Sequence, residues 1–198
     1  MGIFTTQAKI ADRHPSASGE SGGAACRLRV PVAIWDGLTE WLRASEQERF
    51  AYLLGRASAV DDPWGRRTVD VWVRRAVPVP DQALVIQSPV RVEVDPTFSA
   101  AVLQACWEGG LSLIDVHTHP FADASVGFSG HDRNNMLHTH AEFAASIPTD
   151  PPAVAASLVL GRRSAAGTWL VPGTNRLEPL HSLHIIGTHD EEIPLCES

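Results

Sequence analysis

Hydrophobic residues recur along the chain with two spacings, one typical of helices and one of strands. Pro31 opens a segment whose apolar residues recur at i, i+4, i+7 and i+8, which predicts an amphipathic helix ending near Ala44. A second helix is predicted from Pro96 up to the Gly109-Gly110 pair, because glycines commonly end helices. A third is predicted from Ser129 to about Ala144.

Strands are predicted where apolar residues alternate with polar ones or form short runs. The run Phe50 to Leu54 is expected to stop at Gly55 and to form a hairpin with the alternating segment Thr68 to Val79. Residues 78–96 contain several prolines and are expected to form a flap with one short strand at 91–94. The other predicted strands are 27–30, 111–119, 154–160, 168–171 and 183–186.

The order of these elements is strand, helix, two strands, flap, helix, strand, helix and further strands. Helices and strands mixed without a strict repeat predict an α+β fold with a mixed sheet. Residues 1–25 are rich in Ser, Gly and Ala and are expected to be a flexible leader, which leaves 26–198 as a single domain. The 198 residues, 44% hydrophobic and 20% charged, suit one globular domain with a core.

Charge and cysteine content exclude several classes of protein. A formal net charge of -7 argues against a nucleic-acid-binding surface, which would show clustered Lys and Arg. No apolar run approaches the roughly 20 residues that span a bilayer, so we expect a cytoplasmic protein without a membrane partner. Cys26, Cys106 and Cys196 form no C-x-x-C pair, so reduced thiols are expected rather than disulfides or a structural zinc site.

Candidate chemistry is concentrated around two histidines at the end of an apolar strand. Residues two apart on a strand point to the same face, so His117 and His119 can aim both imidazoles at one point. Pro120 lacks an N–H group and is expected to end the strand there. Asp132, three residues after Ser129 at a predicted helix start, can add a carboxylate, which completes a ligand set typical of catalytic zinc.

Each motif also has an ordinary structural explanation. An H-x-H pair occurs by chance, and Ser-x-x-Asp before a helix is a common capping box. Another H-x-H pair, His138 and His140, lies in a predicted helix, where residues two apart diverge by about 200° and cannot share a metal. His131 is expected at the surface. Asp115 either orients a ligand histidine or is simply a buried carboxylate with its own partners.

Together the motifs resemble the signature of the JAMM metalloproteases, also called MPN-plus. The resemblance lies in His117-Thr118-His119-Pro120 followed by Ser129-Gly130-His131-Asp132, and in Glu48 placed seven residues before Gly55. It covers about Arg27 to Pro172. Two features depart from the family: the nine residues between His119 and Ser129 are more than is common, and Ala51 stands where a glycine is frequent.

The resemblance implies a curved mixed sheet flanked by helices and one Zn²⁺ per chain, held by His117, His119 and Asp132. Glu48 would be the general base and acid, and Ser129 would donate a hydrogen bond to the oxyanion. The implied activity is that of a zinc isopeptidase that cleaves the amide bond after the C-terminus of a ubiquitin-like protein. Such an enzyme would act on conjugates of that modifier or on its precursor.

A narrower resemblance concerns the Phe-Ser-Gly-x-Asp box, Phe128 to Asp132. It is similar to bacterial members encoded in antiphage Bil operons beside ubiquitin-like, activating-enzyme-like and conjugating-enzyme-like proteins, which would then be partners. Processing of a sulfur carrier stays open.

Two other functions fit part of the sequence. Ile114 to His119 also resembles the first metal strand of amidohydrolases and phosphoesterases, but those barrels need about 250 residues, mostly after this strand, and only about two-fifths of this chain follows His119. A non-catalytic MPN scaffold would typically lack the ligands that this chain carries.

Overall fold

The computed structural model describes residues 25–61, 67–187 and 190–196, and all structural statements concern these residues. The expected leader lies outside them, except for Ala25, which begins the first strand. The elements are β1 (Ala25–Pro31), α1 (Val32–Arg43), β2 (Phe50–Asp61), β3 (Arg67–Pro78), the 3-10 turn η1 (Asp81–Ala83), β4 (Leu84–Ser88), β5 (Arg91–Val94), α2 (Pro96–Gly109), β6 (Ser112–Thr118), α3 (Gly130–Ser146), β7 (Ala155–Leu160), β8 (Ala165–Leu170), β9 (Leu177–Pro179), β10 (Ser182–Ile186) and β11 (Glu191–Ile193).

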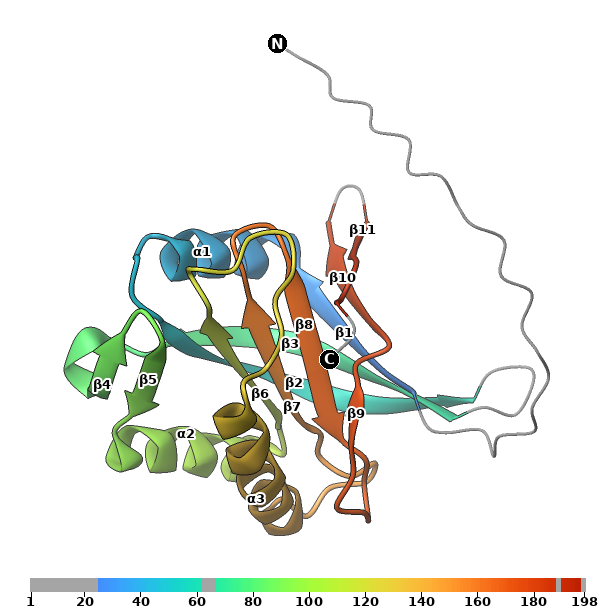
Figure 1. Ribbon diagram of the computed structural model, residues 1–198. Helices are drawn as coiled ribbons and strands as arrows, with labels where there is room; N and C mark the ends of the chain where they lie inside the picture. The colour runs from blue at the N-terminus through green and yellow to red at the C-terminus, as the bar shows by residue number, and fades with distance from the viewer. Residues whose placement is uncertain (1–24, 62–66, 188–189, 197–198) are drawn as a thin grey trace.

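The fold is α+β, built on a strongly curled mixed sheet of nine strands with three helices (Figure 1). The strand order is β11-β10-β1-β3-β2-β6-β7-β8-β9. β1 runs parallel to both of its neighbours, and β6 runs parallel to β7, whereas the other pairs are antiparallel. The predicted α+β class with a curved mixed sheet is therefore confirmed, and the predicted helices and strands occur in the predicted order.

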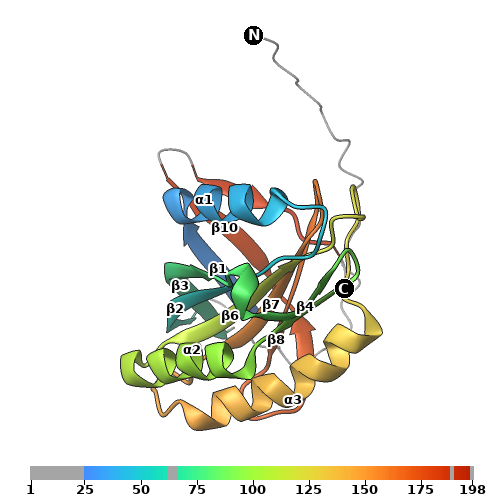
Figure 2. The same ribbon diagram turned by 90° about the vertical axis from the view of Figure 1, so that its left-hand side faces the viewer.

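The helices cover opposite faces of the sheet, α1 on one face and α2 with α3 on the other (Figure 2). β6 crosses the middle and contributes alternate residues to both faces. Ile114 and Val116 join the core beneath α1, while Leu113 packs against the core beneath α2 and α3. The strand that carries the histidines is thus fixed from both faces.

The prediction that Gly55 ends its strand is wrong. β2 continues to Asp61, and its register with β3 shifts between Leu54 and Gly55. A Cβ atom at Gly55 would lie 2.6 Å from the carbonyl oxygen of Trp72, so the two backbones can approach this closely only at a glycine. The glycine therefore marks a bulge within a long strand, as glycines in strands often do.

The predicted flap contains a hairpin of two strands rather than one short strand. β4 and β5 pair only with each other and form a separate sheet beside the main one. Its hydrophobic residues divide between two environments: Leu84 and Val94 pack against the core, whereas Val85 is 60% exposed.

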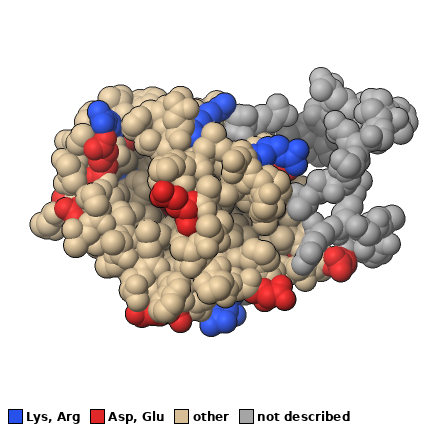
Figure 3. Space-filling view, turned by 90° about the horizontal axis from the view of Figure 1, so that it is seen from below, with Lys and Arg blue, Asp and Glu red and all other residues tan. Residues whose placement is uncertain are grey.

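None of the helices in the described ranges is long and apolar enough to cross a membrane. On the face seen in Figure 3, charged side chains stand in small separate groups with a largely uncharged surface between them.

Candidate metal centre

His117 and His119 project from the end of β6 toward the same side. His117 lies within the strand, and the His119 N–H still donates to the carbonyl of Leu160 on β7 at 2.9 Å, so strand geometry persists beyond Thr118. After Pro120 the chain turns, and the Ala122 N–H donates back to the His119 carbonyl. The predicted placement of both histidines at the mouth of the strand is confirmed.

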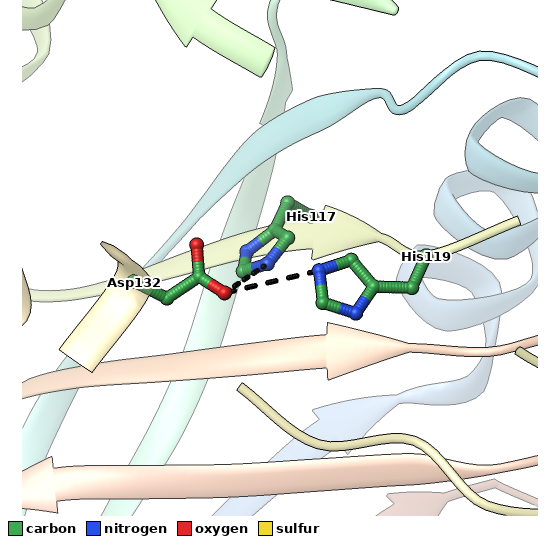
Figure 4. A group of neighbouring side chains, drawn as sticks. All are labelled: His117, His119 and Asp132. Atoms are coloured by element: carbon green, nitrogen blue, oxygen red, sulfur yellow. Dashed lines mark ion pairs between the residues drawn. The ribbon is translucent and has the colours of Figure 1, made fainter. Parts of the chain in front are cut away.

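Asp132 comes from the first turn of α3 and is oriented by a complete capping box. The Ser129 N–H donates to Asp132 Oδ2 at 2.7 Å, and the Asp132 N–H donates to Ser129 Oγ at 3.2 Å. This reciprocal pair fixes the carboxylate, as capping boxes do. The same oxygen, Oδ2, faces both histidines (Figure 4).

The ligand atoms of the three side chains lie within 4.8 Å of one another, near enough to bind one ion. Asp132 Oδ2 lies 3.7 Å from Nε2 of His117 and 3.8 Å from Nε2 of His119, which is too long for hydrogen bonds. Tetrahedral ligands of zinc stand about 3.3 Å apart, given metal–ligand distances of about 2.0 Å. His117 Nε2 is buried and has no hydrogen-bond partner among the described residues. This donor set therefore fits a metal ion, and His117, His119 and Asp132 could hold one.

The electrostatics of the group follow from burial and mutual proximity. Burial opposes ionisation of Asp132, but His117 and the hydrogen bonds from Ser129 outweigh it and hold the pKa of the carboxyl well below its usual range. Burial also opposes protonation of His117, yet Asp132 and two further carboxylates raise the pKa of His117 overall. Burial and the neighbouring His117 lower the pKa of His119.

Glu48 lies beside this group although it is far from it in sequence. It precedes β2 and is only 4% exposed, with its Oε1 3.6 Å from His119 Nε2. Burial raises the pKa of Glu48 to about 7, with His117 lowering it and Asp132 raising it by smaller amounts. The structure thus brings Glu48 together with the three candidate ligands. Ser129 stands at the exposed rim, where it caps α3.

Three aromatic rings line the group, and sequence reasoning assigned no role at the site to two of them, Phe50 and Phe121. Phe50 on β2 stacks on His117 with ring centres 6.3 Å apart, and Phe128 lies 6.1 Å from the same ring. Phe121 stacks on His119 at 5.2 Å and is 63% exposed. Phe121 follows directly after the His-x-His-Pro run, and this is the only signal that could have identified it. These rings shield the imidazoles and restrict their rotation.

The remaining candidate residues separate as their helical spacing predicts. His138 is exposed and pairs with Glu142, whereas His140 is buried against the sheet, so the two imidazoles do not meet. His131 is exposed and lies 3.1 Å from Asn135. Asp115 proves to be a carboxylate with its own partners: its Oδ2 accepts from Ser157 at 2.7 Å and lies 3.1 Å from His140 Nε2.

Comparisons with known proteins add no identity. No protein-family pattern matches the sequence, and no curated protein matches it. Among solved structures, the N-terminal domain of Trichoplax adhaerens STIL matches with a TM-score of 0.37 and 12% sequence identity. The match covers 80% of this chain and 45% of that one, so the chain spans less than half of that structure. A likeness of this size carries no argument about function.

Proposed function

We propose that this protein is a zinc-dependent peptidase or isopeptidase of the JAMM type. Its substrate would be the amide bond that follows the C-terminus of a ubiquitin-like protein, either in a conjugate or in a precursor. The observation that carries the proposal is the convergence of His117, His119 and Asp132, with the carboxylate of Glu48 3.6 Å from His119. These four residues come from three separate segments of the chain, and their proximity supports the proposal.

In the proposed mechanism the three ligands hold the metal ion, and Glu48 transfers the proton. A zinc ion held by His117, His119 and Asp132 would supply Lewis-acid polarisation and lower the pKa of a water molecule to about 7. Glu48 accepts the proton of the attacking water and passes it to the leaving amine. Ser129, at the rim of the group, donates its hydroxyl hydrogen to the oxygen that becomes negatively charged.

The environment of Glu48 supports this role. A proton shuttle works best when its pKa is near the working pH, and burial raises the pKa of Glu48 to about 7. An exposed glutamate would remain ionised and would return the proton poorly. Phe50 and Phe121 stack on His117 and His119 and cover part of each imidazole.

The β4–β5 hairpin is the proposed binding element for the extended tail of the modifier. Among the described strands β4 pairs with β5 alone, so, apart from Ser88, whose carbonyl accepts the Glu48 N–H, its other edge can accept an added strand. Val85 is exposed, and Ile86 is half-buried, so the hairpin offers apolar side chains as well as backbone groups. Replacing Leu84 to Ile86 by Gly-Ser-Gly should raise KM for a modifier fusion and leave zinc content unchanged. An unchanged KM would remove the hairpin from the proposal.

The proposed cellular setting is a bacterial conjugation system of the Bil antiphage type in the cytoplasm. The activating-enzyme-like and conjugating-enzyme-like proteins of such a system would be further partners. This part rests on the Phe128 to Asp132 box alone. The neighbouring genes would identify the modifier to use as substrate.

The alternative of an amidohydrolase barrel is not favoured, because the sheet is mixed and open, with β11 and β9 at its edges, rather than a closed parallel barrel. A metal-binding scaffold without activity remains the rival that the experiment must separate.

The decisive experiment combines metal analysis with a cleavage assay on the full chain. The substrate is a ubiquitin-like protein extended at its C-terminus, and intact-mass spectrometry locates the cut. We expect roughly one zinc per chain, cleavage after the modifier's last residue, loss of cleavage with a chelator and recovery with Zn²⁺. Zinc binding without any cleavage would favour the scaffold, and absence of zinc would refute both.

A further inference from the structure

Glu48 belongs to no helix or strand, so its carboxylate must be positioned by contacts from outside its own segment. The residues between α1 and β2 form no regular structure, and Glu48 lies two residues before β2, with Arg49 between them. Four hydrogen bonds nevertheless hold the backbone here, two from β6 and two from the β4–β5 hairpin.

The contacts from β6 come from Thr118, the residue between the two histidines. The Arg49 N–H donates to Thr118 Oγ1 at 2.9 Å, and the Thr118 N–H donates to the Arg49 carbonyl at 3.1 Å. Thr118 is 3% exposed, and its side chain lies on the sheet face opposite to the imidazoles. The hydroxyl thus ties the Glu48 segment to the strand that carries both histidines.

The contacts from the hairpin act on Glu48 directly. The Glu48 N–H donates to the Ser88 carbonyl at 2.8 Å, and the Gln87 side-chain amide donates to the Glu48 carbonyl at 3.2 Å. The N–H and carbonyl groups of Glu48 are therefore both hydrogen-bonded to the β4–β5 hairpin, and those of Arg49 are both hydrogen-bonded to Thr118 on β6.

We propose that Thr118 and Gln87 are positioning residues for Glu48. Through these bonds, they hold Glu48 Oε1 3.6 Å from His119 Nε2, although neither side chain touches the reacting atoms. This inference rests on the proposed function, in which Glu48 moves the proton. A shift of about 1 Å in a catalytic group can cost about 100-fold in rate, so a loop glutamate needs such bonds.

Thr118→Val removes the hydroxyl and keeps the shape of the side chain, while Thr118→Ser restores the hydroxyl. A matched control is Ser112→Ala, because Ser112 lies on the same face of β6, is equally buried and accepts the Val154 N–H at 2.9 Å far from the site. We expect kcat to fall about 10- to 100-fold in Thr118→Val, with KM and zinc content unchanged. Thr118→Ser and the Ser112 control should keep the wild-type kcat.

A second readout is independent of activity. In the zinc-loaded full chain, amide hydrogen exchange at Arg49 should accelerate in Thr118→Val and return to the wild-type rate in Thr118→Ser. Gln87→Met, at a half-buried position, should lower kcat in the same way and covers the case in which Thr118→Val fails to fold.

The outcomes separate this inference from the proposed function. If wild type cleaves nothing, the proposed function fails. Separately, an unchanged rate of amide exchange at Arg49 in Thr118→Val would show that the Thr118 hydroxyl does not hold the Glu48 segment, and this would refute the inference. If wild type is active, a Thr118→Val or Gln87→Met variant with wild-type kcat refutes the positioning role. A fall in kcat matched by the Ser112 control would also refute it, because the loss would then follow from general destabilisation.

Discussion

Two clusters of acidic and histidine side chains lie side by side between β6 and α3, and they differ in how closely their atoms approach. One cluster is His117, His119 and Asp132; the other is Asp115, His140 and Ser157. In the second, every pair is within hydrogen-bond distance, at 2.7, 3.1 and 3.1 Å. In the first, the carboxylate stands 3.7 and 3.8 Å from the imidazoles.

The difference shows which cluster has room for an ion. The three groups of the Asp115 cluster bond to one another and leave no space for an ion between them, so this cluster is closed, although the other ring nitrogen, His140 Nδ1, has no partner among the described residues. Groups that converge without bonding leave buried atoms unsatisfied, as at His117 Nε2, unless something else occupies the gap. Residue types alone would not distinguish the two clusters, since both contain an aspartate on one element and a histidine on the other.

The hydrogen bonds of the closed cluster also help to position Asp132 of the open one. His140 and Asp132 both belong to α3, while Asp115 and His117 both belong to β6. The bonds of Asp115 to His140 and Ser157 therefore fix α3 against the sheet, and this fixes the start of α3, where Asp132 faces the histidines. We expect the two clusters to respond differently to substitution.

The largest effect should come from removing the ligands of the open cluster. His117→Ala combined with His119→Ala should abolish zinc binding, because a single carboxylate cannot hold the ion against water. Metal analysis by mass spectrometry after dialysis measures this. His131→Ala combined with His138→Ala removes two exposed histidines and should keep roughly one zinc per chain. Zinc retained in the first variant would refute the site.

Next in size is the effect of Glu48 on hydrolysis. Glu48→Gln should keep zinc and lose about 10² to 10⁴ in kcat, because the amide cannot accept the proton. Glu46→Gln is the matched control, since Glu46 is exposed and pairs with Arg162 rather than with a candidate ligand. An active Glu48 variant together with an inactive Glu46 variant would show that the base had been assigned to the wrong residue.

Substitution in the closed cluster should affect stability rather than metal stoichiometry. Ser157→Ala deprives Asp115 of its shortest hydrogen bond and should lower the free energy of unfolding by about 1–3 kcal/mol. Urea unfolding of the metal-free protein measures the loss. Zinc content should stay at the wild-type value, and a variant that loses zinc without losing stability would contradict the distinction between the clusters.

The parts of this molecule that were predictable depend on short-range patterns. The period of two placed His117 and His119 on one face, and the spacing from Ser129 to Asp132 gave both the cap and the candidate ligand. The location of Glu48 depends on the antiparallel register that sets Phe50 opposite His117, and no local pattern encodes a register between distant segments. The family resemblance supplied that residue instead.

Long-range contacts account for what was missed. β1 lies between β10 and β3, parallel to both, and nothing in its alternating pattern names its neighbours. The short edge strands β9 and β11 have too few residues to show a period. The local pattern predicts a strand end at Gly55, but this position requires glycine because the carbonyl of Trp72 on another strand approaches it closely.

The smallest expected effect is the dependence of zinc affinity on pH. A histidine binds zinc only when unprotonated, and Asp132 with neighbouring carboxylates raises the pKa of His117 above its ordinary value. Protons therefore compete for His117 at a higher pH than for an ordinary histidine, whereas the lowered pKa of His119 keeps that ring available to lower pH. Zinc affinity should fall by up to about tenfold over the first pH unit below the raised pKa of His117. Competition with a chromophoric chelator measures the affinity, and calorimetry in two buffers counts the protons released. If the zinc affinity did not change with pH over this range, zinc binding would not displace a proton from His117. The ion would then have to be held by other residues.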